Sequence, residues 1–196
     1  MQSRGTPLSG VFVLEPQLYS DHRGHFFEAF NQRVGESLLG PSLADPSSDP
    51  SSPPPLQFVQ DNQSHSKQWV LRGLHYQIQQ AQGKLVRVVA GEIFDVMVDL
   101  RRSSPTFGQW HGEYISAHDR QQVWIPPGFA HGFLVVSPEA DVLYKVTDYH
   151  APAHERTLLW NDPALAIAWP LPPDHQPVLS PKDAVGTPLA QAEVFP

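Results

Sequence analysis

The sequence predicts an all-β domain, an antiparallel sandwich or barrel for which a jelly roll is the natural solution. Three observations lead to this prediction. Short apolar or alternating runs recur along the chain, with turn signals between them. Proline is in excess, at 21 of 196 residues, and it interrupts helix interiors and central strands alike. The first half of the chain has only one segment with a helical pattern, so we expect many short strands and a large share of loop.

Ten segments carry the strand pattern, each bounded by turn residues. In chain order they are Val11–Glu15, His25–Phe30, Gln57–Asn62, Val70–Gln77, Lys84–Ala90, Glu92–Leu100, Gly112–Ile115, Gln122–Ile125, Gly132–Val136 and Val142–Thr147. Ala90-Gly91-Glu92 lies between two strong strands and predicts a tight hairpin. A short helix is expected over Arg33–Leu39, because Gly40-Pro41 ends it.

The chain is expected to form one domain over residues 1–196, which is long enough to bury a core. Residues 41–55 are mainly proline and serine, a composition too polar to pack, and they predict a surface insertion. From about Asp148 the chain is again rich in proline. We expect this part to wrap around the barrel with a few short helical turns.

Composition narrows the class of partner. The formal charge of −7 disfavours binding to a nucleic-acid backbone, which requires a basic footprint, but is compatible with a small anionic ligand. Cysteine is absent, so disulfides, zinc–thiolate sites and cysteine nucleophiles are excluded. No signal-peptide pattern begins the chain, and no apolar run approaches the roughly 20 residues that span a bilayer. We therefore expect a cytoplasmic protein with no membrane partner.

Ionisable and polar side chains lie inside segments that otherwise have the pattern of buried strands. These residues are Arg72, His75, Lys84, His131 and Tyr144. Each alone could have a structural role, such as a hydrogen-bonded core histidine or a lysine at a strand end. Together, on strands well apart in sequence, they indicate a barrel lined with acid, base and charge, because buried polar groups cost free energy unless they are paired or used.

Arg72 and His75 are three residues apart, so a regular strand would point them to opposite faces. A bulge or bend at Gly73 could bring both side chains inward. The pattern alone leaves these two arrangements open.

A metal site is the competing interpretation, because the chain has ten histidines. Metal sites on barrel strands favour two histidines at positions i and i+2, and the chain has no His-x-His. Glycine-rich phosphate loops and the Gly-x-Ser-x-Gly nucleophile pattern are also absent. The sequence therefore predicts no metal and no cofactor.

Several motifs occur in an order that extends from about Val11 to Asp183. They are Asp21–Glu28, Phe58–Asn62, Leu71–Gln77, Gly83–Arg87, Ser104–Gly108, Trp124–Phe133, Trp160–Asp162 and Leu179–Asp183. In these motifs the chain resembles the dTDP-4-dehydrorhamnose 3,5-epimerase family, whose members have a metal-free cupin-type jelly-roll barrel. The resemblance implies a single epimerase domain, with residues 41–55 as an insertion.

The resemblance also implies a reaction at C3 and C5, the two carbons that flank the C4 ketone of dTDP-4-dehydro-6-deoxy-D-glucose. By this resemblance His75 is the base and Asp183 the carboxylate that orients it. Lys84 holds the oxyanion of the enolate, and Tyr144 returns a proton to the opposite face, which inverts the centre.

For binding, the resemblance assigns six residues of this chain to the sugar nucleotide: Gln60, Asn62, Arg72, His131, Glu155 and Lys182. Arg23 and Glu28, with the aromatic Tyr19, match residues that reach in from a partner subunit, which implies a homodimer. His150 stands where the family often has a tyrosine that stacks on the thymine ring. The implied partner is a dTDP-sugar.

Three alternatives stay open. A cupin sugar-nucleotide enzyme could act at one centre only or isomerise the ketone. A barrel that binds a sugar nucleotide without catalysis is disfavoured, because binding requires no acid–base pair. A metal-dependent cupin oxygenase is disfavoured by the missing His-x-His.

Overall fold

The computed structural model of the protein describes residues 1–39 and 56–196, so the expected insertion at 41–55 lies outside the described residues. The strands are β1 (Gln2–Gly5), β2 (Phe12–Glu15), β3 (Tyr19–Asp21), β4 (Gly24–Phe26), β5 (Gln60–Lys67), β6 (Leu71–Gln77), β7 (Lys84–Ala90), β8 (Glu92–Asp99), β9 (Trp110–Ser116), β10 (Gln122–Ile125), β11 (Phe129–Val135), β12 (Glu139–Val146) and β13 (Glu155–Thr157). The helical elements are α1 (Gln32–Leu39) and the 3₁₀ turns η2 (Pro152–His154), η3 (Asp183–Val185) and η4 (Leu189–Gln191).

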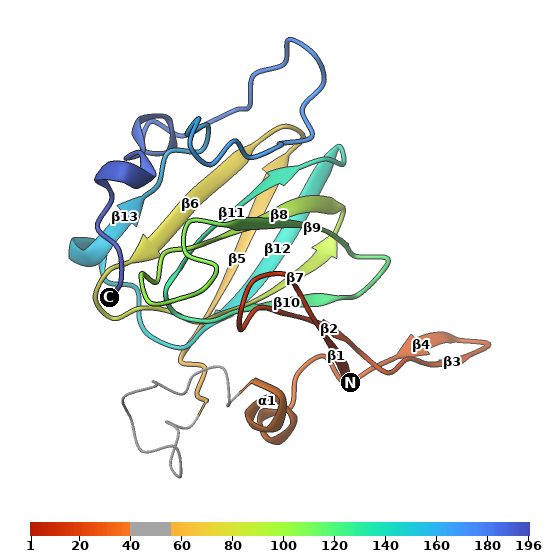
Figure 1. The fold of residues 1–196 in the computed structure, drawn as a ribbon. Coiled ribbons are helices and arrows are strands. Elements are labelled where there is room, and N and C mark those ends of the chain that lie inside the picture. The colour runs from red at the N-terminus through yellow and green to blue at the C-terminus, as the bar shows by residue number, and fades with distance from the viewer. Residues whose placement is uncertain (40–55) are drawn as a thin grey trace.

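Two antiparallel sheets form the body of the molecule (Figure 1). One has the order β1-β2-β10-β7-β12-β5, and the other has the order β13-β6-β11-β8-β9. From β5 to β12 the pairing is nested: β5 with β12, β6 with β11, β7 with β10, and β8 with β9. This nesting is the connectivity of a jelly roll, so the predicted fold class is confirmed.

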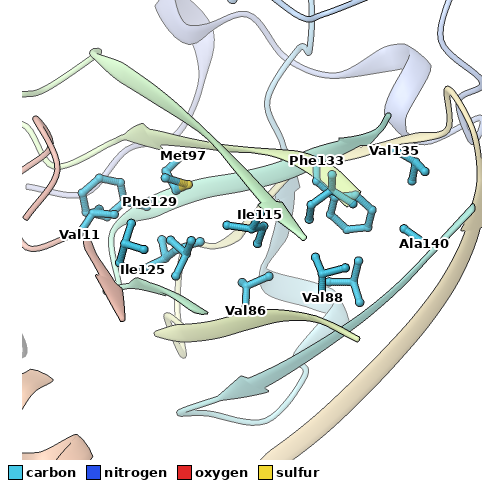
Figure 2. Close-up of a cluster of buried hydrophobic side chains, with 14 of the residues drawn as sticks. Val11, Val86, Val88, Met97, Ile115, Ile125, Phe129, Phe133, Val135 and Ala140 are labelled. Atoms are coloured by element: carbon cyan, nitrogen blue, oxygen red, sulfur yellow. The ribbon is translucent and has the colours of Figure 1, made fainter. Parts of the chain in front are cut away.

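The main core lies between the two sheets. Val86 and Val88 of β7 face Ile115 of β9 and Phe133 of β11 across it, and all four are buried (Figure 2). Each such side chain contributes about 1.5–3 kcal/mol when it is removed from water. Apolar or alternating runs in the sequence are what made these strands predictable.

Two smaller cores cover the outer faces of the sheets. The C-terminal region places Leu158 and Leu165 against Leu74 and Val96 of the five-stranded sheet. On the six-stranded sheet, α1 and the segment that precedes β5 pack around Trp124. The C-terminal region thus lies against the β-sandwich, as its composition suggested.

Some predicted boundaries are wrong. The strand expected over His25–Phe30 exists only as β4, and β5 begins at Gln60 and runs to Lys67 rather than starting at Gln57. Strands β1, β3 and β13 were not predicted. The first two are fully exposed, so they lack the apolar alternation that identifies a strand. The expected helix is present within one residue of its predicted start.

A β-bulge in β6 explains how Arg72 and His75, three residues apart, face the same side of the strand. His75 pairs with His131 and Arg72 pairs with Phe133, so two residues of β6 oppose one residue of β11. Gly73 has φ +124°, a conformation that favours glycine. The bulge changes the alternation, and both Arg72 and His75 face one cavity.

We expect Gly73→Ala to lower the free energy of unfolding by about 2–4 kcal/mol, since it adds both backbone strain and overpacking. A Cβ at this position would lie 2.5 Å from the Cα of Gly132 and 2.8 Å from the carbonyl oxygen of His131. Urea unfolding measures the change. Gly5→Ala is the matched control, because a Cβ there meets nothing within 4 Å. Equal stability of the two variants would contradict the assignment of the bulge.

Candidate active site

A cavity of about 290 Å³ lies between the two sheets. It is lined by side chains of both. Nine of the predicted site residues line it: Gln60, Asn62, Arg72, His75, Lys84, His131, Tyr144, His150 and Glu155. The fold therefore brings together residues from strands that are distant in sequence.

His75 and Asp183 form a hydrogen-bonded pair at the wall of this cavity. The distance from Nε2 of His75 to Oδ1 of Asp183 is 2.6 Å, and Asp183 is only 4% exposed at the start of η3. Burial raises the pKa of Asp183, but the hydrogen bond and charge of His75 outweigh it and hold that pKa below its usual value. A carboxylate only accepts hydrogen bonds, so Nε2 carries a proton, and in the neutral form of the ring Nδ1 has the lone pair. The geometry is that of an oriented base.

Lys84 places a buried amine in the same cavity. Its Nζ donates to the carbonyl oxygen of His75 at 3.1 Å, and the residue is 8% exposed. Burial lowers the pKa of Lys84 to about 8, against the opposing charges of Asp95 and Glu155. The amine is therefore an ammonium at neutral pH, and it can stabilise an oxyanion in a site with little water.

Tyr144 lies on the wall opposite His75, because β12 belongs to the six-stranded sheet and β6 to the five-stranded sheet. Burial raises the pKa of Tyr144, so its phenol keeps its proton near neutral pH. An acid and a base thus face the cavity from different sheets.

The model of the dTDP-4-dehydrorhamnose 3,5-epimerase family matches residues 5–191 of the chain. The chain belongs to this family. The epimerase of Pseudomonas aeruginosa is 53% identical over 196 residues, which cover all of both chains. These matches confirm that the protein is an isomerase with a cupin-type jelly-roll fold.

Solved structures of epimerases agree with this assignment. The dTDP-6-deoxy-D-glucose-3,5-epimerase of Legionella pneumophila, in complex with dTDP-4-keto-L-rhamnose, has a TM-score of 0.87 and 48% identity, covering 98% of this chain and 94% of that one. A 3′-monoepimerase of Streptomyces bikiniensis, in complex with dTDP-quinovose, has a TM-score of 0.80 and 32% identity, covering 94% and 86%. Both similarities cover nearly the whole chain.

The other predicted binding residues surround the cavity of this epimerase. Nζ of Lys182 lies 2.5 Å from Oε1 of Glu155, and Nε2 of His150 lies 3.8 Å from its other oxygen. Burial raises the pKa of Glu155, but the hydrogen bond and charge of Lys182 outweigh it and lower that pKa overall. Arg72 is held by Ser66, whose hydroxyl accepts from its Nε at 2.9 Å.

Five of the fourteen predicted residues do not line the cavity of their own chain. Asp183 and Lys182 are paired with the lining residues His75 and Glu155, and the other three are Tyr19, Arg23 and Glu28. Tyr19 and Arg23 belong to the β3–β4 hairpin, which projects from the body of the molecule (Figure 1). Arg23 is paired with Asp21 at 2.5 Å and is strongly exposed, while Glu28 accepts a hydrogen bond from Asn31 at 3.1 Å. Their predicted contribution across a dimer interface stays a prediction.

Six residues that line the cavity were not predicted from the sequence, namely Ser64, Tyr76, Gln77, Gln82, Gly132 and Phe133. Asp95, the partner of the lining residue His131, was not predicted either. Asp95 of β8 is fully buried, and its Oδ1 lies 2.7 Å from Nε2 of His131. The sequence contained a signal for Asp95, because a lone acid in the apolar run Ile93–Met97 requires a partner when it is buried.

In the described ranges, residues 1–39 and 56–196, no three side chains of the metal-ligating types are grouped so that they could hold a metal ion. Among the same residues, no helix is both long and apolar enough to cross a membrane.

Proposed function

We propose that the protein epimerises dTDP-4-dehydro-6-deoxy-D-glucose at C3 and C5 to give dTDP-4-dehydro-L-rhamnose, the precursor of dTDP-L-rhamnose. The observation that carries this proposal is the placement of the His75–Asp183 pair and of Tyr144 on opposite walls of one cavity. A base and an acid on the same face of the sugar ring would only exchange the proton of the carbon. A base and an acid on opposite faces allow the configuration of that carbon to be inverted. Family membership supports the substrate class.

In the proposed reaction, Nδ1 of His75 takes the proton from a carbon next to the C4 ketone. The electron pair of that C–H bond moves into the ring, and the ketone oxygen becomes an enolate oxyanion. The Lys84 ammonium donates a hydrogen bond to this oxyanion, which is stronger in the enolate than in the ketone. The Tyr144 hydroxyl then gives its proton to the other face of the same carbon. Both groups exchange protons with water before the second centre reacts.

The sugar nucleotide is proposed to bind through the polar residues around the cavity. Arg72 carries a guanidinium group at the cavity, and such a group matches the oxygens of a pyrophosphate. His150 would stack on the base. The complex of the Legionella pneumophila relative with dTDP-4-keto-L-rhamnose supports this class of ligand.

We also propose that the protein acts as a homodimer in which Arg23 and Glu28, with Tyr19, complete the partner's site. The projecting hairpin exposes Tyr19 and Phe26, whose aromatic side chains are 63% and 70% accessible in the single chain. We expect Arg23→Ala to raise KM for the sugar nucleotide while the sedimentation coefficient stays that of a dimer. A monomeric wild-type protein with full activity would contradict this assignment.

The reaction class can be tested by incubating the purified protein with dTDP-4-dehydro-6-deoxy-D-glucose and identifying the product by NMR. We expect dTDP-4-dehydro-L-rhamnose to form without added metal and at the same rate in the presence of a chelator. Loss of activity on chelation, restored by iron, would contradict the epimerase proposal and favour an oxygenase. Binding without any product would favour a non-catalytic barrel.

We expect kcat to fall as the pH rises through about 8. The reason is that the Lys84 ammonium, present below its pKa of about 8, loses its proton above it and then carries no charge to stabilise the enolate. A pH–rate profile measures this alkaline decrease of kcat. In Lys84→Arg the guanidinium stays charged over the whole pH range of the profile, so the residual activity should not fall as the pH rises through about 8. A wild-type rate that is flat to pH 10 would contradict the role of Lys84.

A further inference from the structure

A second histidine–aspartate pair lies beside the first. His131 of β11 is the register partner of His75 of β6, and its Nε2 lies 2.7 Å from Oδ1 of Asp95. His131 is 8% exposed and Asp95 is fully buried. Because a carboxylate only accepts, Nε2 of His131 carries the proton and Nδ1 keeps a lone pair.

Asp95 has a second oxygen that the pair does not use. Within the described residues, Oδ2 of Asp95 is buried and has no hydrogen-bond partner. A buried carboxylate oxygen without a hydrogen-bond partner costs free energy unless a nearby charge compensates it.

Lys84 lies in the same cavity as His131, and its Nζ donates at 3.1 Å to the carbonyl oxygen of His75, the register partner of His131. The groups that act on Lys84 are Asp95 from β8 and Glu155 from β13, which favour its ammonium, and Lys182, which opposes it. The groups that act on His131 are Asp95, Lys84 and His75. Asp95 is thus the buried anion that both Lys84 and His131 share.

We propose that Asp95 is a positioning residue with two effects on the site. It holds the ring of His131 so that Nδ1 can accept a hydrogen bond from a substrate hydroxyl, and its charge keeps the Lys84 side chain an ammonium. The first effect rests in part on the proposed function, because it invokes a sugar ligand. The second concerns the protein alone.

NMR of the full chain without substrate tests both effects. The chain has four lysines, so a ¹³C-lysine spectrum resolves them, and the spectrum of Lys84→Arg assigns the Lys84 signal. In Asp95→Asn we expect the titration midpoint of Lys84 to fall by about 1 pH unit, because one opposite charge is lost. An unchanged midpoint in the folded variant would overturn the charge effect.

The ring of His131 gives an independent readout in the unmodified protein. Long-range ¹⁵N–¹H spectra should show the Nε2–H form of His131 in the wild type and a loss of that preference in Asp95→Asn. The Nδ1–H form in the wild type would overturn the positioning effect, even if Asp95→Asn did not fold. In turnover, the alkaline limb of kcat should move with the Lys84 midpoint.

Asp99→Asn is the matched control. Asp99 is also fully buried on β8, but its oxygens accept hydrogen bonds from Arg101, Ser104 and Thr106, whereas Asp95 is paired with the cavity residue His131. We expect this variant to unfold at a lower temperature with the Lys84 and His131 spectra unchanged. If the wild type showed no epimerase activity, the proposed function would fail while both NMR readouts would still decide the role of Asp95.

Discussion

Replacing His75 with alanine is expected to lower proton exchange at both C3 and C5 by roughly 10²–10⁴-fold, the contribution of a positioned base. Both carbons should be affected, because the cavity presents one histidine that is hydrogen-bonded to Asp183 and faces Tyr144 from the opposite sheet. The measurement is the rate at which deuterium from solvent enters each position, followed by NMR. A variant that loses exchange at only one carbon would indicate a second base.

Two further variants separate the chemistry from the fold. Asp183→Asn keeps the shape of the side chain but removes the charge that orients His75, so exchange should fall by about the same factor. His111 offers a matched control, since its Nε2 also contacts a carboxylate, that of Glu113, at 3.1 Å on β9, away from the cavity. His111→Ala should exchange at the wild-type rate. Persistent exchange in both His75→Ala and Asp183→Asn would contradict the role of the pair.

Tyr144→Phe is expected to lower net inversion by about 10²-fold while exchange at the face of His75 stays within about tenfold of the wild type. The phenyl ring preserves the packing of Tyr144, but it has no proton to give to the opposite face of the enolate. The comparison requires two rates from one sample, product formation and deuterium entry into unreacted substrate.

Tyr114→Phe controls for the loss of a hydroxyl. Tyr114 is half exposed on β9, where it packs against Phe94, and it does not line the cavity. It should leave both rates unchanged. If Tyr144→Phe reduced inversion and exchange equally, Tyr144 would have a structural role and another acid would be required.

The sequence predicted the strands that bury apolar side chains, either in a continuous run, as in β8, β10 and β11, or on alternate positions, because burial imposes these two patterns. It missed β1 and β3, whose exposed residues carry no such pattern. The polar residues inside β6, β7 and β12 were correctly identified as lining one cavity, since an ionisable group in an apolar strand costs free energy unless it is paired or used.

The contacts between these residues could not be predicted from the sequence pattern, because they join segments that are far apart in the chain. Asp183 lies 108 residues from His75 and belongs to a 3₁₀ turn, so no periodicity connects them. The bulge at Gly73 depends on the close approach of Gly132 on another strand. The family resemblance supplied the partner of His75, and only the structure showed that Arg72 shares its cavity. Asp95 was visible as a lone acid, but its contact with His131 required the register of β8 and β11.

The most direct test of the proposed double epimerisation is a proton NMR time course of dTDP-4-dehydro-6-deoxy-D-glucose with the protein in deuterated buffer. We predict that the signals of H3 and H5 both disappear as dTDP-4-dehydro-L-rhamnose forms. Disappearance of only one signal would contradict action at both centres and indicate an enzyme that acts at one carbon. Retention of both signals, with the sugar nucleotide bound, would contradict catalysis altogether.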